Sequence, residues 1–134
     1  RLVPVDEPAQ VYVLNTCTVT HVADRKARQA IRAIRRRNPD ATIVATGCYP
    51  QRAPQDLRAM EEVDLVVGNT DKADLVRQVM EWRGQSPVPC AVGADPDGFS
   101  PRIARTRAMV RIQEGCDQVC AYCIVPKVRG ITQQ

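Results

Sequence analysis

The chain has 134 residues, of which 44% are hydrophobic, 25% are charged and 4% are aromatic, and its formal net charge is +4. This composition excludes a collagen-like, coiled-coil or wholly disordered chain. No apolar stretch approaches the roughly 18 residues of a membrane-spanning helix, and the sequence opens with no signal peptide. We therefore expect a cytoplasmic protein without a membrane partner and with an aliphatic core. A complete large barrel needs about 250 residues, so we also expect a piece of a longer protein.

Alternating strand and helix patterns occupy residues 1–84. Short runs of β-branched, aliphatic and aromatic residues predict buried strands at 11–14, 43–46 and 64–67. A helical pattern follows each strand, which predicts an α/β fold with an open parallel β-sheet flanked by helices. The helices are expected from a cap at Thr20 to Asn38-Pro39, from Pro54 to about Glu62, and from a cap at Thr70 or Asp71 to about Arg83.

Residues 85–104 are rich in Pro and Gly and are expected to form a linker, with a short strand at 88–92. Cys90 lies in this linker without a companion, and we interpret it as a bystander thiol. Residues 107–112 alternate in polarity like a strand and lead into a cysteine cluster. The predicted organisation is therefore a first domain at 1–84, a linker at 85–104 and the start of a second domain at 105–134.

Cys17, Cys48 and Asn69 each follow a predicted strand. The carboxyl ends of parallel strands share one edge of the sheet, where open α/β folds build their sites. The two cysteines are therefore expected within reach of one bound group. The alternative is that they are two ordinary buried cysteines that pack as small hydrophobic residues.

Cys116, Cys120 and Cys123 form a C-x3-C-x2-C motif. Three thiolates on one short loop suit three irons of a [4Fe–4S] cluster, because cysteine thiolates are the usual ligands of such clusters. The fourth iron would then keep an open coordination position. A structural zinc site with a distant fourth ligand is the alternative.

Basic residues gather in two segments. Seven lie between Arg25 and Arg37 with no acid among them, and six lie between Arg102 and Arg129 against Glu114 and Asp117. Such clusters suit a phosphate backbone or another polyanion. A solvated helix face is the alternative for the first segment.

The residues around these motifs carry a family resemblance. The C-x3-C-x2-C motif with Tyr122 before its last cysteine resembles the signature of radical S-adenosylmethionine (SAM) enzymes. The runs 105–116 and 124–130 resemble the methylthiotransferase branch, as do Asn15–Thr20 and Thr46-Gly47-Cys48. Within that branch, Asn15–Thr20 followed by 23–29 is most similar to threonylcarbamoyladenosine tRNA methylthiotransferases. The resemblance covers residues 11–130.

The resemblance implies two [4Fe–4S] clusters and SAM as cofactors. Cys116, Cys120 and Cys123 would hold the radical-generating cluster, whose open iron would bind SAM, and Tyr122 would pack near the adenine of SAM or else simply pack within its loop. Cys17 and Cys48 would be two of three ligands of the second cluster, the third belonging on a strand before Arg1. Residues 105–134 would be the first strand and cluster loop of a truncated radical SAM barrel.

The reaction implied by the resemblance is methylthiolation of C2 of N6-threonylcarbamoyladenosine beside the tRNA anticodon. The partners would be the anticodon loop of tRNA, an electron donor such as flavodoxin or ferredoxin, and a sulfur donor, and the 25–37 cluster is a candidate contact for the RNA backbone. This chain alone is expected to be inactive. Two enzyme alternatives remain, namely isopentenyladenosine tRNA and an aspartate of a ribosomal protein as substrates. A non-catalytic iron–sulfur or zinc module that binds RNA is the alternative of another class.

Overall fold

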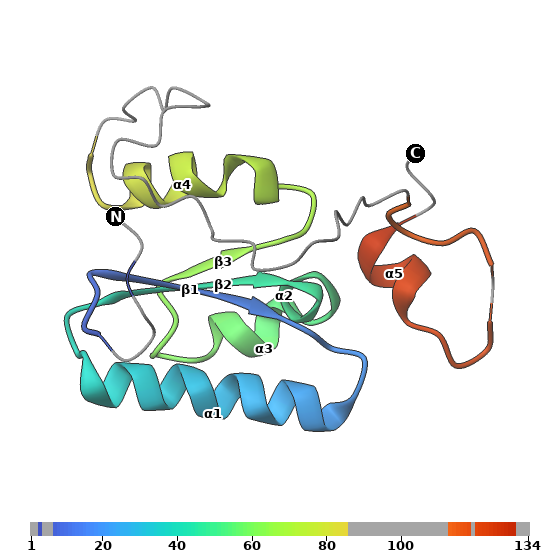
Figure 1. The fold of residues 1–134 in the computed structure, drawn as a ribbon, viewed down its shortest axis with the longest axis horizontal. Coiled ribbons are helices and arrows are strands. Elements are labelled where there is room, and N and C mark those ends of the chain that lie inside the picture. The colour runs from blue at the N-terminus through green and yellow to red at the C-terminus, as the bar shows by residue number, and fades with distance from the viewer. Residues whose placement is uncertain (1–2, 4–6, 86–112, 119, 131–134) are drawn as a thin grey trace, which may run out of the picture.

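A three-stranded parallel sheet organises the first part of the chain (Figure 1). The computed structural model describes residues 3, 7–85, 113–118 and 120–130. Strands β1 (Val11–Thr16), β2 (Thr42–Gly47) and β3 (Leu65–Val67) lie in the order β1-β2-β3. In the register, Val11 pairs with Thr42 and Val44 pairs with Leu65. The expected α/β fold with a parallel sheet is thus confirmed, whereas the barrel strand expected at 107–112 lies outside the described residues.

Helix α1 (His21–Arg37) follows β1 and begins where the sequence predicts. The Thr20 side chain accepts a hydrogen bond of 3.1 Å from the Ala23 amide, which satisfies one of the free amides of the first turn. The helix ends at Arg37, and Asn38 follows as its C-cap, because the residue before Pro39 avoids helical backbone angles. Figure 1 shows α1 and α3 (Pro54–Arg58) on one face of the sheet and α4 (Leu75–Trp82) on the other.

Two predicted helices differ from the structure. The helix expected from Pro54 to about Glu62 is only α3, and a second short helix, α2 (Cys48–Arg52), precedes it. The chain leaves α3 early because the Met60 amide bonds to the Leu57 carbonyl and the Val63 amide bonds to the Met60 carbonyl, forming tight turns. Neither Thr70 nor Asp71 caps a helix with its side chain, since a 3₁₀ turn, η1 (Lys72–Asp74), comes before α4.

The core lies on both faces of β2, whose six residues are all buried. One cluster joins the sheet to α1, α2 and α3, and it contains the fully buried Tyr49. The expectation of an aliphatic core is therefore wrong at this position. Burial of the ring is tolerated because its hydroxyl accepts a 2.5 Å hydrogen bond from Arg28. The second cluster, Val44, Val67 and Val79, joins the sheet to α4.

After the gap at 86–112, the described chain ends in α5 (Val125–Arg129), which lies beside α2. The linker, the strand expected at 88–92 and Cys90 fall within this gap. The domain boundaries at 84 and 104 therefore stay predictions. Among the described residues, no helix has the length and apolar character needed to cross a membrane.

Candidate metal centre at the carboxyl edge of the sheet

Cys17 and Cys48 leave the sheet at neighbouring positions. Cys17 follows Thr16, the last residue of β1, and Cys48 follows Gly47, the last residue of β2, and Thr16 and Gly47 are register partners. Both thiols are free, Cys17 exposed and Cys48 buried. Their placement at one edge follows from the parallel topology, as the sequence predicts, while their role as ligands stays a prediction.

Gly47 makes the close approach of these two chain segments possible. Its φ of +102° lies in the region that favours glycine, and a Cβ built there would lie 2.4 Å from the Thr16 carbonyl oxygen. Any side chain at this position would push β2 away from β1 just before Cys48. The glycine of the Thr46-Gly47-Cys48 sequence is therefore explained by the backbone geometry of the edge.

A partly buried polar network connects the loop after Cys17 to the helix that begins with Cys48. The Arg52 side chain donates to the Thr18 hydroxyl at 2.6 Å and forms an ion pair with Asp24 at 2.5 Å. Asp24 is 3% exposed, and its Oδ1 atom has no hydrogen-bond partner among the described residues. The guanidinium of Arg52 also lies over the Tyr49 ring, 5.6 Å from its centre. Arg52 thus fixes α2 relative to the Cys17 loop.

Asn69 joins the same edge to α5. Its side-chain amide donates to the Val128 carbonyl at 2.7 Å and lies 3.9 Å from the Cys48 sulfur. Arg129, on α5, also reaches Cys48: a side-chain hydrogen bond and charge attraction at Cys48 raise the pKa of Arg129, and Glu114 and Cys17 add to this in smaller measure. The segment that follows the C-x3-C-x2-C motif therefore docks directly beside Cys48.

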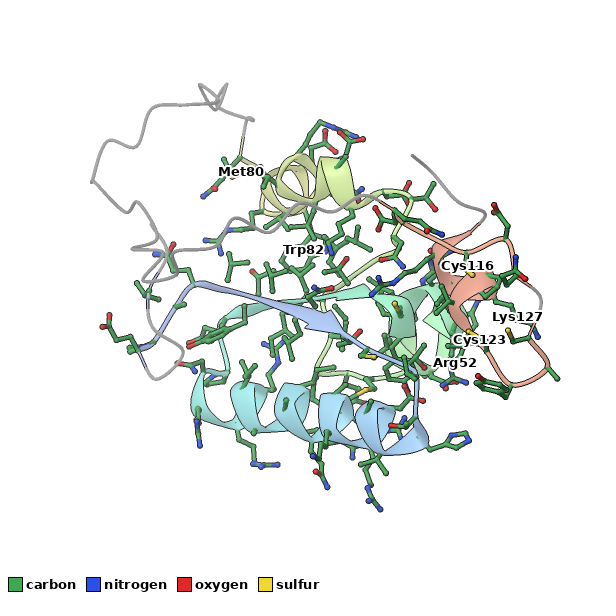
Figure 2. The ribbon with its side chains drawn as sticks, turned by 45° about the vertical axis from the view of Figure 1, so that its right-hand side comes forward. Arg52, Met80, Trp82, Cys116, Cys123 and Lys127 are labelled. Atoms are coloured by element: carbon green, nitrogen blue, oxygen red, sulfur yellow. The ribbon has the colours of Figure 1, made fainter. Side chains whose placement is uncertain are left out.

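The three cysteines of the C-x3-C-x2-C motif lie on a loop next to α5, as Figure 2 shows for Cys116 and Cys123. The Cys116 amide bonds to the Gly130 carbonyl at 3.2 Å, so α5 closes this loop at its base. All three thiols are free. Tyr122 is 93% exposed and so does not pack within the loop.

The donor set of this loop fits an iron–sulfur cluster chemically, because it offers three free thiols within eight residues. Across the described part of the chain, however, no three His, Cys, Asp or Glu side chains converge closely enough to hold a metal ion. Binding therefore requires the three sulfurs to draw together. The assignment of Cys116, Cys120 and Cys123 as ligands stays a prediction, as does that of Cys17 and Cys48.

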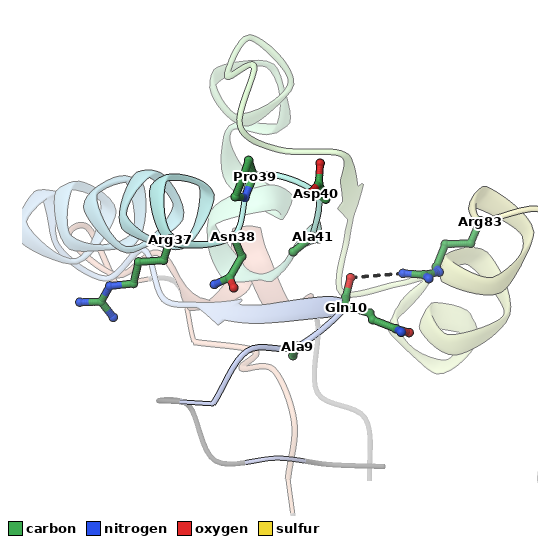
Figure 3. Close-up of a pocket in the computed structure, with 8 residues that line it drawn as sticks. All are labelled: Ala9, Gln10, Arg37, Asn38, Pro39, Asp40, Ala41 and Arg83. Carbon is green, nitrogen blue, oxygen red and sulfur yellow. Dashed lines mark hydrogen bonds between the residues drawn. The ribbon is translucent and has the colours of Figure 1, made fainter.

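Two cavities of similar size lie at opposite edges of the sheet. The cavity at the amino edge, of about 360 Å³, contains none of the predicted cysteine ligands, and Arg37 of the basic segment 25–37 lines it (Figure 3). The cavity at the carboxyl edge, of about 350 Å³, lies between α2, the loop after β3 and α5. It is lined by Gln51, Asn69, Thr70, Glu114, Lys127, Val128, Arg129 and Gly130.

Sequence reasoning placed Asn69 at the edge but missed the contacts of Asp24, Arg52 and Arg129. The Arg52–Asp24 pair spans 28 positions, and the Asn69–Val128 contact spans 59. No local periodicity or spacing signals contacts of this separation. These contacts become visible only in the tertiary structure, where strand pairing brings the distant segments together.

Comparison with known proteins identifies the family of this chain. Residues 1–68 match the family described as "Uncharacterized protein family UPF0004". The chain is 42% identical, over 97% of its length, to the threonylcarbamoyladenosine tRNA methylthiotransferase MtaB of Aquifex aeolicus, and 40% identical, over 94%, to that of Bacillus subtilis. It is also 32% identical, over 93%, to the ribosomal protein uS12 methylthiotransferase RimO of Pelobacter propionicus.

The chain spans about a third of the length of these relatives, covering 33%, 30% and 30% of them in the same order. The match nevertheless includes both the sheet domain and the cysteine loop, because it extends over nearly all of the chain. The chain belongs to the UPF0004 family, and its relatives are enzymes named as methylthiotransferases.

Proposed function

We propose that this chain forms part of a methylthiotransferase that modifies C2 of N6-threonylcarbamoyladenosine next to the tRNA anticodon. The observation that carries the proposal is the meeting of two cysteine-bearing segments at one edge of the sheet. Asn69 bonds to the Val128 carbonyl and lies beside the Cys48 sulfur, so the segment after Cys123 sits against Cys48, and Cys17 leaves the neighbouring strand. The two clusters that the family resemblance implies would have to lie close together for sulfur to pass from one site to a radical formed at the other.

In this proposal Cys116, Cys120 and Cys123 hold one [4Fe–4S] cluster, and Cys17 and Cys48 supply two ligands of a second. When bound, the clusters and SAM supply radical chemistry that can act on an unactivated C–H bond, which no side-chain base could deprotonate. The protein's part is to position these groups. Tyr122 is exposed beside the cysteine loop, where its ring is free to stack on the adenine of SAM.

The tRNA substrate is supported by the names and identities of the relatives. The identities to the tRNA enzymes of Aquifex aeolicus and Bacillus subtilis are 42% and 40%, against 32% for the enzyme named for ribosomal protein uS12. Threonylcarbamoyladenosine is the nucleoside in the names of the two tRNA enzymes. An electron donor and a sulfur donor complete the proposed set of partners.

The first experiment is anaerobic reconstitution of this chain with iron and sulfide, followed by metal analysis and electron paramagnetic resonance. The C-x3-C-x2-C motif should bind about four irons, and Cys120→Ala should lose them. Cys90→Ala is the matched control, and it should keep its iron. If both variants lose the same amount of iron, the ligand assignment is wrong.

The second experiment uses an enzyme of the relatives' full length that contains this chain. It should methylthiolate purified tRNA carrying threonylcarbamoyladenosine, and Cys120→Ala should abolish reductive cleavage of SAM. Modification of ribosomes but not of tRNA would replace the proposed substrate by a ribosomal protein. RNA binding without any SAM cleavage would instead favour the non-catalytic module.

A further inference from the structure

The structure divides the seven cations of α1 into two groups. Arg28 and Arg35 turn toward the domain: Arg28 donates to the Tyr49 hydroxyl at 2.5 Å, and Arg35 forms an ion pair with Asp64 at 2.7 Å. Arg32 makes a looser ion pair of 3.5 Å with Glu62, and its side chain remains 53% exposed. These three cations are at least partly neutralised or held within the fold.

The other four cations, Arg25, Lys26, Arg36 and Arg37, are exposed. Within the described residues they form no ion pair and no side-chain hydrogen bond. The only acid on α1, Asp24, is buried against Arg52 and so does not offset their charge. The outer face of α1, which we define by these four residues, therefore carries four unpaired positive charges.

These four residues form two pairs at opposite ends of the helix. Arg25 and Arg36 are eleven positions apart, as are Lys26 and Arg37. Eleven residues turn an α-helix by about 20° beyond three full turns and advance it by about 16 Å. Along the helix, Arg25 is therefore nearly in line with Arg36, and Lys26 is nearly in line with Arg37.

Helix stability explains only one of the pairs. Arg36 and Arg37 lie in the last turn of α1, where cations interact favourably with the helix dipole. Arg25 and Lys26 lie near the other end of the helix and gain nothing from the dipole. Figure 2 shows nitrogen-tipped side chains projecting from α1 away from the sheet, and Figure 3 shows Arg37 pointing away from Gln10 and Arg83.

The outer face of α1 is also continuous with the cysteine edge. The helix begins four residues after Cys17, so Arg25 and Lys26 lie toward the carboxyl edge of the sheet and Arg36 and Arg37 toward the amino edge. A polyanion that contacts both pairs would thus extend along α1 toward Cys17. The spacing of about 16 Å lets the two pairs contact phosphates several nucleotides apart.

We infer that the outer face of α1 binds the phosphate backbone of the RNA substrate and directs it to the cysteine edge. This inference rests on the proposed function, since it takes the substrate to be RNA. Four unpaired arginine and lysine side chains suit phosphate contacts, which position a nucleic acid without reading its sequence. A protein partner would instead favour large aromatic or apolar anchors, and the exposed apolar residues of α1 are only Val22, 48% exposed, and the small Ala30.

The test is RNA binding by this chain, measured by fluorescence anisotropy with an anticodon stem–loop RNA at several salt concentrations. Arg25→Gln/Lys26→Gln/Arg36→Gln/Arg37→Gln should bind at least about tenfold more weakly at low salt. The slope of log affinity against log salt should become shallower by about three, since each phosphate contact contributes roughly 0.7 to 0.9. Gln forms helices about as well as Arg and Lys, so the thermal midpoint should fall only slightly, through the lost interaction of Arg36 and Arg37 with the helix dipole.

The matched control keeps the charges. Arg25→Lys/Arg36→Lys/Arg37→Lys should retain both the affinity and the salt slope, because lysine still contacts phosphate. An unrelated RNA hairpin of the same length should show the same losses, since backbone contacts carry no sequence information. An unchanged slope in the glutamine variant would overturn the inference while leaving the cysteine chemistry untouched. Loss of iron from Cys120→Ala tests that chemistry separately.

Discussion

The two edges of the sheet each carry an aspartate–arginine pair, but the pairs are built differently. At the amino edge, Arg35 contacts Asp64 and three backbone carbonyls, and the Asp64 carboxylate also accepts from the Ile43 amide. At the carboxyl edge, the Asp24 carboxylate has Arg52 as its side-chain partner, and one of its oxygens has no partner among the described residues. The Arg35–Asp64 pair is therefore held by several further groups, whereas the Asp24 carboxylate depends on one arginine.

This difference indicates separate tasks for the two edges. The shared contacts at the amino edge hold the turns before β2 and β3 and serve the fold. The single Arg52–Asp24 contact lies between the segments that carry Cys17 and Cys48. Proteins tend to tolerate incomplete polar pairing near functional sites, where other demands compete with stability. Variants that remove one contact at a time test whether the two edges differ in this way.

The largest loss is expected for Arg52→Ala, which should lower the free energy of unfolding by about 3 kcal/mol. It leaves the Asp24 carboxylate, only 4% exposed as a side chain, without its counter-charge. Urea denaturation measures the change. Adding Asp24→Asn to Arg52→Ala should restore part of the stability, because the buried charge is then removed as well. No recovery in the double variant would mean that Arg52 acts through packing on Tyr49 instead.

A smaller loss, of about 2 kcal/mol, is expected for Arg35→Ala at the amino edge. Asp64 remains 22% exposed and keeps the Ile43 amide as a partner, so its charge is not stranded. The same denaturation experiment provides the value. Arg36→Ala, on the next residue of the helix, should change stability by less than about 0.5 kcal/mol. If Arg35→Ala lowers the free energy of unfolding more than Arg52→Ala does, the proposed difference between the two edges is wrong.

Thr20→Ala should cost about 1 kcal/mol, because it removes the side chain that caps α1 just after the Cys17 loop. Thr20→Ser keeps the hydroxyl and should recover most of this loss. Thermal unfolding followed by circular dichroism is sufficient to rank the two variants. Equal stability of the alanine and serine variants would show that the cap contributes little at this edge.

The smallest effect on global stability, below about 0.5 kcal/mol, is expected for Asn69→Ala, because it breaks one contact of a peripheral helix. Locally the effect should be clear: α5 loses its bond to the edge, and trypsin should cleave faster after Lys127 and Arg129. Gln78→Ala, which alters an exposed hydrogen bond on α4, is the control. Unchanged cleavage would mean that other contacts hold α5 beside Cys48.

Features that depend on neighbouring residues could be predicted from the amino-acid sequence. The three strands, the cap at Thr20, the end of α1 before Pro39 and the position of Cys17 and Cys48 after their strands all follow from local patterns. The parallel order then placed the cysteines at one edge, because consecutive strand–helix units wind in the same sense.

The contacts between distant side chains, in contrast, depend on how the helices pack on the sheet. Helical periodicity places Arg28 and Arg36 about 80° apart around α1. It does not reveal that Arg28 bonds to Tyr49 while Arg36 stays exposed. The burial of Tyr49, the Arg52–Asp24 pair and the contact of Asn69 with Val128 likewise join residues 21 to 59 positions apart. Such contacts stabilise the fold only when distant segments have already been packed together, so no local sequence pattern encodes them.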